Sequence, residues 1–240
     1  MWYNNLKLTV NKSPFCGIMT LKRREGDTME YENVKRSIGF VFAAGVLEFF
    51  ASGISLVSEQ FERFSSENTE ALYLALSTVA FLLSMAAYIL YISGMTMARK
   101  EERTFNSSVI MIFLLFAINV VDIMFTIVEF PFRFESLVSH VTVLLKTAII
   151  IYICIGYSKV FAAMDRKKPA KDGLITILIF IFVFAFSAML EIIGQINTAD
   201  EEFKSALTAT LTMIYSMLSM VCLIKYVFFL YRAKKILQSS

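Results

Sequence analysis

The sequence contains little charge, one imidazole and few thiols. Of its 240 residues 18% are charged, and it has a single histidine and three cysteines. One imidazole excludes zinc and haem sites that need several histidines. The cysteines, Cys16, Cys154 and Cys222, share no metal-ligand spacing, so we expect free thiols. These shortages predict that the protein holds no metal and no cofactor.

The sequence motifs of common enzymes are also missing. The chain has no His-Glu-x-x-His metal motif, no Gly-x-Ser-x-Gly nucleophile elbow and no glycine-rich phosphate loop. Its longest polar segment is the amino-terminal stretch, which is too short for a soluble domain. We therefore predict that the protein is not an enzyme, although a buried acid–base pair leaves intramembrane catalysis as the least favoured alternative.

Apolar residues are abundant and come in long blocks. They make up 57% of the chain, and the mean hydropathy is +0.65, whereas soluble domains are nearer half apolar and a quarter charged. Six blocks have the length that spans a bilayer: 38–58, 71–95, 108–132, 137–162, 174–196 and 207–231. Continuous apolarity excludes barrel strands, which alternate. The predicted fold is all-α, a polytopic membrane protein with six transmembrane helices.

The basic residues are distributed unevenly between the connecting segments. Seventeen Lys and Arg residues lie in alternate segments, 1–36, 99–107, 163–173 and 232–240. Only Arg63, Arg133 and Lys204 lie in the other three connections. Because basic residues favour the cytoplasmic side, both termini are predicted to be cytoplasmic. The same residues then serve as membrane anchors, and we expect a lipid partner and no nucleic-acid partner.

The chain divides into a basic cytoplasmic arm (1–36), a membrane domain (37–237) and a short tail (238–240). Within the arm, Lys22–Met29 can be encoded by a purine-rich stretch that resembles a bacterial ribosome-binding site before an ATG. One interpretation is that the native start is Met29 and that residues 1–28 are a translated leader. The alternative is an ordinary basic arm lying on the membrane surface. The first interpretation favours a bacterial protein of the cell membrane.

The six spans can be laid out as three similar hairpins. Each first helix carries one acid flanked by apolar pairs, at Glu48, Asp122 and Glu191. Each second helix carries a tyrosine followed eight or nine residues later by a basic pair, at Tyr91, Tyr157 and Tyr226. Topology alone accounts for the basic pairs, so the recurring acid is the informative feature. A triplicated hairpin and coincidence both remain open as explanations.

Ionisable residues inside the spans are the best candidates for function, because such groups are costly in lipid. Glu48, Asp122 and Lys146 each lie about ten residues from the outer end of a span, roughly 15 Å deep. Glu129 and Glu191 lie nearer the outer surface. We expect the three deeper groups to face a protein interior or an aqueous cavity.

The short connection centred near Phe134 sets which residues of its two helices share a depth. Asp122 and Lys146 are each twelve residues from that centre, and Glu129 and His140 are five and six residues away. The hairpin can therefore hold an Asp122–Lys146 ion pair and a Glu129–His140 contact. A structural pair and a charge pair lining a solute path are both consistent with this spacing.

In that arrangement Glu48 has no evident basic partner. Desolvation favours the protonated form of a lone carboxyl at this depth. A protonated Glu48 suits a proton carrier, and it equally suits a neutral group that is hydrogen-bonded to Ser52, Ser84 or Thr142.

Three functions follow in order of preference. The first is a small solute or ion transporter, or a permease subunit, that uses the buried charges. The second is a membrane accessory, sensory or immunity protein that acts through a protein partner or as a homo-oligomer. The third is the intramembrane enzyme.

Overall fold

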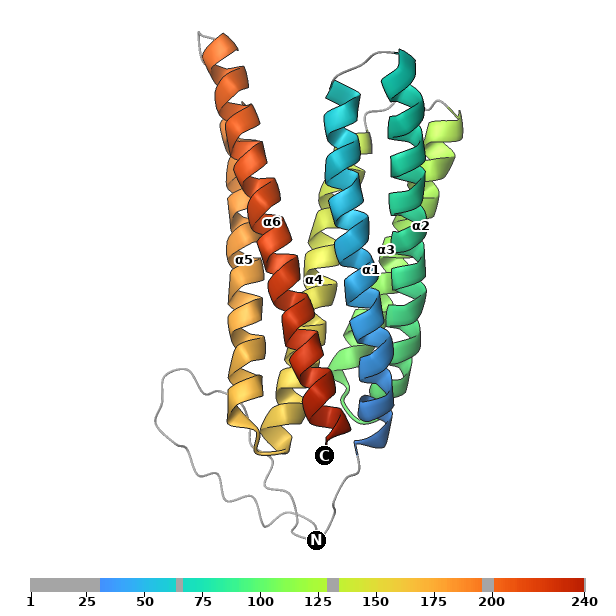
Figure 1. The fold of residues 1–240 in the computed structure, drawn as a ribbon, viewed down its shortest axis with the longest axis vertical. Coiled ribbons are helices and arrows are strands. Elements are labelled where there is room, and N and C mark those ends of the chain that lie inside the picture. Colours follow the sequence, from blue (N-terminus) through green and yellow to red (C-terminus); the bar gives the residue numbers. More distant parts are fainter. Residues whose placement is uncertain (1–30, 64–66, 129–133, 196–200, 240) are drawn as a thin grey trace, which may run out of the picture. The chain divides into compact units, whose positions relative to one another are not determined.

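The structure, a computed structural model, describes residues 31–63, 67–128, 134–195 and 201–239. This part of the chain forms six helices (Figure 1): α1 (Glu32–Arg63), α2 (Glu67–Ala98), α3 (Thr104–Val128), α4 (Phe134–Ala163), α5 (Lys167–Gln195) and α6 (Glu201–Gln238). No strand occurs among the described residues, so the predicted all-α class is confirmed. The hypothetical leader, residues 1–28, lies outside them.

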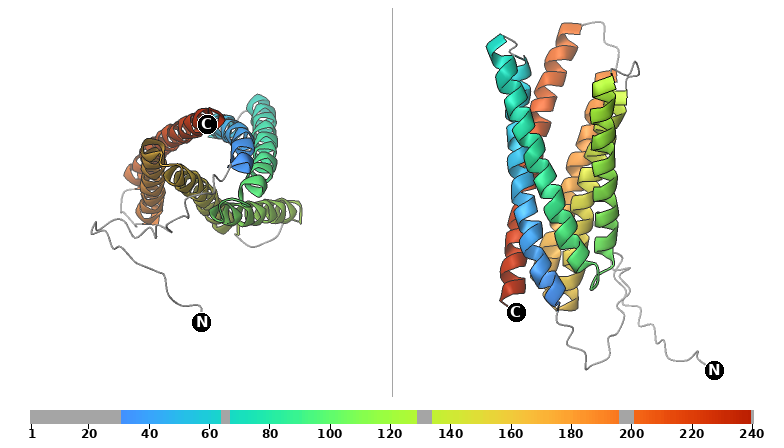
Figure 2. Two further views of the ribbon diagram at one scale, coloured as in Figure 1. Left: turned by 90° about the horizontal axis from the view of Figure 1, so that it is seen from below. Right: turned by 90° about the vertical axis from the view of Figure 1, so that its right-hand side faces the viewer.

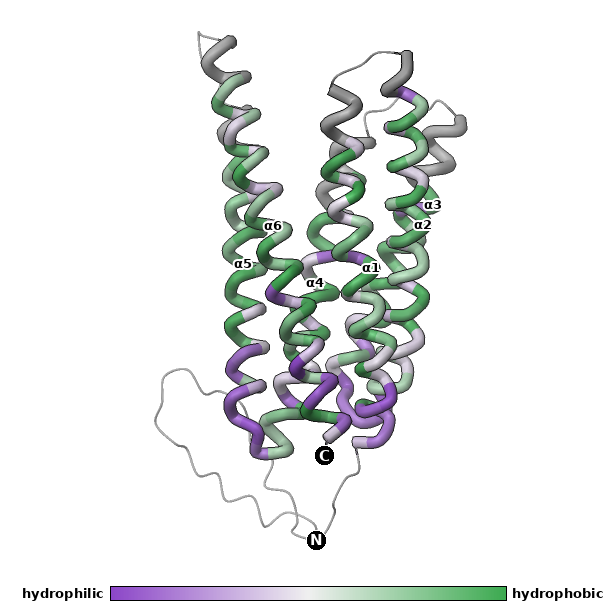
Figure 3. The backbone as a smooth tube through the Cα atoms, viewed as in Figure 1, coloured by the Kyte–Doolittle hydropathy of each residue, from purple (hydrophilic) through white to green (hydrophobic). Residues whose placement is uncertain are grey.

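All six helices are long and apolar enough to cross a membrane. They contain 25 to 38 residues, which is about 37 to 57 Å at 1.5 Å per residue. The hydrocarbon core of a bilayer is about 30 Å thick, so each helix extends beyond it. Figure 3 shows the apolar part of the helices, with hydrophilic residues gathered at the end where α1 begins and α6 ends. The chain is therefore an integral, multi-pass membrane protein.

The helices form a ring in sequence order. Each helix packs against the next one along the chain, and α6 packs against α1 and closes the ring. Figure 2 shows this order in the view along the helices. Three hairpins, α1–α2, α3–α4 and α5–α6, follow one another around the ring, which places α1 and α4 on opposite sides.

The core occupies only one half of the bundle. No described side chain is buried in α3 after Leu115, in α4 before Leu145, in α5 after Val183 or in α6 before Cys222. We call the part between the start of α1 and the level of these four residues the near half, and the remainder the far half. In the far half the buried residues of the described chain, such as Ser58, belong to the α1–α2 hairpin.

The near half is packed by side chains from every helix. The largest fully buried ones are Tyr157, Tyr226, Phe105, Phe161, Phe229, Ile38, Met95, Ile112, Leu115, Ile153, Leu230 and Leu237. Phe105 and Tyr157 meet edge to face with ring centroids 5.0 Å apart, an arrangement that favours aromatic pairs. The three hairpins are thus held together in the near half.

Polar contacts connect the helix ends at the rim of the near half. The Glu101 carboxylate accepts hydrogen bonds from the backbone N–H groups of Asn33 (2.9 Å) and Val34 (3.2 Å), which caps the first turn of α1. The Lys159 ammonium donates to Thr104 Oγ1 at 2.8 Å and lies 3.6 Å from a Glu102 oxygen. The connection between α2 and α3 is therefore bound to both α1 and α4.

A third connection at this rim joins α5 to α6. Asp172 lies 2.6 Å from the Arg232 guanidinium and 3.5 Å from the Lys225 ammonium. Arg232 is seven residues after Lys225, so both lie on one face of α6. Lys159 and Lys225 thus both form ion pairs in the near half.

Candidate functional site

An ion pair between Glu48 and Lys146 joins opposite sides of the ring. Lys146 Nζ on α4 lies 3.3 Å from Glu48 Oε1 on α1. The Glu48 side chain is only 8% exposed, whereas the Lys146 side chain is 36% exposed. Because Lys146 adjoins Leu145, the pair lies at the boundary between the near and far halves. Among the described residues no other ion pair lies this far from the rim.

This pair corrects one expectation drawn from the sequence. Glu48 was predicted to have no basic partner, and the structure gives it Lys146. The prediction was wrong because it compared depths within the α3–α4 hairpin alone. A ring of six helices also brings α1 opposite α4, and the long side chains of Glu48 and Lys146 meet across it.

The other charged candidates cannot be placed as precisely. Asp122 belongs to α3, His140 to α4 and Glu191 to α5, but their side chains lie outside the described part of the structure, as does Glu129 entirely. The proposed Asp122–Lys146 and Glu129–His140 contacts therefore stay predictions.

Two tyrosines of α2 lie beside the ion pair. Tyr88 is buried and interacts electrostatically with both Glu48 and Lys146. Tyr91 is buried and interacts with Glu48. The two phenols are three residues apart and share a face of α2. The pair from α1 and α4 is thus accompanied by two phenols of α2.

Three buried tyrosines, which we call the tyrosine layer, follow one another from the pair toward the rim of the near half. Tyr91 comes from α2, Tyr157 from α4 and Tyr226 from α6, and all three are almost completely buried. The hydroxyls of Tyr91 and Tyr226 interact, although their geometry falls short of a hydrogen bond. Tyr157 Oη lies 3.2 Å from Ser37 Oγ on α1. A series of polar side chains therefore extends from Glu48 toward the rim.

Several of these buried polar atoms have unused hydrogen-bonding capacity. Within the described part of the chain five side-chain atoms have no hydrogen-bond partner: Glu48 Oε2, Tyr91 Oη, Tyr226 Oη, Ser108 Oγ and Ser158 Oγ. Buried polar groups are normally hydrogen-bonded to protein or to internal water. Three of the five belong to the pair and the tyrosine layer. Chemically, this arrangement can bind a polar solute or conduct protons through hydroxyl groups.

Comparison with known proteins adds no assignment. No protein-family model, no curated protein and no solved structure matches the chain. The described residues hold no group of three side chains suited to bind a metal ion. Any function must therefore be argued from the geometry of the interior.

The pattern of burial around the three tyrosines recurs in all three hairpins, which the sequence only suggested. The residues three and four positions after each tyrosine are also buried: Gly94 and Met95, Val160 and Phe161, and Phe229 and Leu230. A second recurring position lies in the first helix of each hairpin, where Ser37, Ser108 and Thr176 are fully buried.

The acids do not lie at a constant distance from these buried Ser and Thr residues. Glu48 is eleven residues after Ser37, whereas Asp122 is fourteen after Ser108 and Glu191 fifteen after Thr176. The positions that follow each tyrosine are thus buried in all three hairpins. The spacing from the buried Ser or Thr to the acid, by contrast, differs from one hairpin to the next. The signal that could have identified the interior was therefore the recurring tyrosine.

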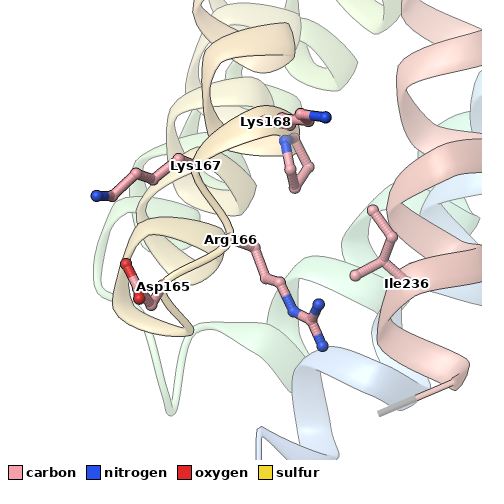
Figure 4. Close-up of a pocket in the computed structure, with 6 residues that line it drawn as sticks. Asp165, Arg166, Lys167, Lys168 and Ile236 are labelled. Carbon is pink, nitrogen blue, oxygen red and sulfur yellow. The ribbon is translucent and has the colours of Figure 1, made fainter.

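Two pockets lie away from this interior. The first, of about 490 Å³, is at the connection between α4 and α5 and is lined by Asp165, Arg166, Lys167, Lys168, Pro169 and Ile236. Figure 4 shows Arg166 extending toward Ile236 and Lys167 pointing away from it. These basic residues belong to the rim and have no direct connection to the ion pair. The second pocket is an apolar groove between α1 and α6.

Proposed function

We propose that the protein is a small transporter or permease subunit that moves a polar solute or ion across the membrane. The observation that carries this proposal is the position of the Glu48–Lys146 pair. It lies inside the ring at the level where α3, α4, α5 and α6 cease to bury their described side chains. A solute entering from the far half would meet this pair first.

The energetics of such a pair favour a functional role. Removing the buried Glu48 carboxylate from water costs several kcal/mol, and its attraction to Lys146 returns this only with good geometry. Well-packed apolar residues would hold α1 and α4 together at least as well. Glu48 Oε2 lacks a partner, so a cationic or hydrogen-bond-donating group can bind there and compete with Lys146. Exchange of partners at Glu48 is the proposed step that couples binding to opening.

We propose that the near end is cytoplasmic, so that both termini lie inside a bacterial cell membrane. The support is the excess of basic residues in the connections at that end. The tyrosine layer then separates the ion pair from the cytoplasm. In this scheme the structure corresponds to a state open toward the outside.

We also propose that the three hairpins are repeats of one unit. Parallel repeats in transporters are related by an axis along the membrane normal, and their relative movement opens one side or the other. The shared burial around Tyr91, Tyr157 and Tyr226 supports the repeat. Movement of one hairpin against the others would close the far half and loosen the tyrosine layer.

The test is flux through purified protein in liposomes. A pH gradient and then a membrane potential are imposed, and wild type is compared with Glu48→Gln. We expect Glu48→Gln to lower the flux at least tenfold while the protein stays folded. Glu32→Gln is the matched control, because Glu32 forms an exposed ion pair with Arg36 at the rim. Full flux through folded Glu48→Gln protein would contradict the role of the pair.

One observation favours the second candidate, an accessory or immunity protein. Met189 of α5 and Met213 and Met217 of α6 are about 60% exposed in the far half. Methionine side chains adapt to different partners, so this surface suits a protein partner or another copy of the chain. Crosslinking in native membranes tests it. A single stoichiometric partner that is lost with Met213→Glu and Met217→Glu, together with no flux, would favour this function over transport.

A further inference from the structure

The groove between α1 and α6 is formed entirely by apolar side-chain surface. Its lining residues are Phe42, Phe49, Ile224, Val227, Phe228 and Tyr231, and its volume is about 380 Å³. Phe228 is 58% exposed and Tyr231 52% exposed. The groove therefore opens toward the surroundings of the bundle, which are lipid in a membrane.

The spacing of the lining residues gives the groove a direction and a length. Phe42 and Phe49 are seven residues apart on α1, and Ile224 and Tyr231 are seven apart on α6. Seven residues are two helical turns, or about 10 Å. Phe42 and Tyr231 face each other with centroids 6.1 Å apart and mark the near end. The groove thus runs along the helices over about 10 Å of a leaflet roughly 15 Å deep.

Two basic residues lie on the near side of the groove, Lys234 at Phe42 and Lys35 about 10 Å further toward the rim. Lys234 Nζ lies 5.1 Å from the centroid of the Phe42 ring. Lys35 is seven residues before Phe42, which puts it on the same face of α1. Neither lysine has a carboxylate partner among the described residues. Positive charge is therefore placed where the apolar groove meets the membrane surface.

We propose that this groove binds one anionic phospholipid. An acyl chain lies between α1 and α6, and Lys35 and Lys234 hold the anionic headgroup. Charge complementarity selects the lipid, because basic residues at a membrane surface attract anionic headgroups. A second copy of the chain fits less well. A two-fold interface over this groove would bring the same lysines toward each other across the contact.

Fluorescence quenching by brominated lipid tests the proposal directly. Trp2 is the single tryptophan of the chain, so Trp2→Phe provides a background without tryptophan. In that background Phe49→Trp reports on the groove. Leu178→Trp is the matched control, because Leu178 is 66% exposed on α5, away from the groove.

Each reporter is placed in phosphatidylcholine vesicles containing equal amounts of brominated phosphatidylglycerol or brominated phosphatidylcholine. We expect phosphatidylglycerol to quench the groove reporter at least threefold more strongly than phosphatidylcholine does, and to quench the control equally. Lys35→Gln with Lys234→Gln should remove the preference, whereas Lys167→Gln with Lys168→Gln should leave it unchanged.

Three outcomes would overturn the proposal. Equal quenching by both lipids at the groove would mean that any lipid lines it. A preference that survives loss of both lysines would show that they do not hold the headgroup. A groove reporter shielded from both lipids in a dimeric protein would mean that a second copy covers it. If the tryptophan variants do not fold, native mass spectrometry of the unaltered protein decides, with one retained phosphatidylglycerol expected and none contradicting the proposal.

Discussion

The near and far halves of the bundle differ in how the hairpins meet. In the near half every helix contributes buried side chains to a common core. In the far half α3, α4, α5 and α6 bury none of their described side chains. The same six helices thus share one buried core in the near half, and no core common to all of them occurs among the described residues of the far half. The Glu48–Lys146 pair lies at the boundary, so a structural change in either half would alter its surroundings.

The largest expected difference is in chemical labelling on the two sides of Glu48. Ala44 is fully buried one turn below Glu48, and Ser52 lies one turn above it on the same face of α1. We expect a water-soluble maleimide to label Ser52→Cys at least tenfold faster than Ala44→Cys, in protein whose native cysteines are replaced. Equal rates would show that the boundary has been placed wrongly.

The next effect concerns the stability of the pair at the boundary. Lys146→Met leaves the buried Glu48 carboxylate unpaired and should lower the free energy of unfolding by about 3 kcal/mol. Adding Glu48→Gln should restore most of that loss. Arg36→Met, at the exposed pair with Glu32, should cost less than about 0.5 kcal/mol. Denaturant titrations in detergent micelles measure all three, and a Lys146→Met variant as stable as Arg36→Met would contradict burial of the pair.

Substitutions at two glycines, one in each half, test the difference in packing between the halves. A Cβ on Gly94 would lie 2.7 Å from Val41 Cγ2 and 3.0 Å from the Ser37 carbonyl oxygen. Gly94→Ala should therefore destabilise the protein by about 2 kcal/mol. A Cβ on Gly53, in the far half, would meet only Met220 Cε at 3.5 Å, an ordinary contact. Gly53→Ala should be neutral or stabilise by up to about 1 kcal/mol, and thermal unfolding that ranks the two variants the other way would refute the comparison.

The smallest effect lies within the tyrosine layer. The Tyr157 hydroxyl has Ser37 as its partner, whereas the Tyr226 hydroxyl has none among the described residues. Tyr157→Phe should cost about 1 kcal/mol, because it leaves Ser37 with one contact fewer. Tyr226→Phe should be neutral or slightly stabilising. Unfolding curves distinguish these variants, and a larger loss for Tyr226→Phe would mean that its hydroxyl has a partner.

The sequence predicted the helices well because their signal is local. Blocks of more than twenty apolar residues can satisfy their backbone in lipid only as helices. Each predicted span accordingly lies on one helix as far as the structure describes it, with the spans 108–132 and 174–196 followed to Val128 and Gln195. The buried acid Glu48 was also found, because an ionisable residue inside an apolar block stands out without any knowledge of the fold.

The partner of Glu48 could not be found in the same way. Pairing across the ring depends on the order in which six helices pack, and no periodicity in α1 or α4 encodes that order. In the sequence Tyr91, Tyr157 and Tyr226 were considered only as part of a possible repeat, yet they are buried in the bundle. Position along a helix can be derived from sequence, whereas the side of the helix that faces a distant neighbour cannot.

The polar contacts at the rim have a mechanical consequence. Glu101 fixes the start of α1, Glu102 binds Lys159, and Asp172 binds Arg232. In the proposed movement these contacts hold helix ends at the rim while the opposite ends of the hairpins move. A helix of 30 residues is about 45 Å long, so a rotation of only about 5° at its pivot displaces the opposite tip by about 4 Å. That displacement exceeds the diameter of a water molecule, and it requires no helix to bend or unwind.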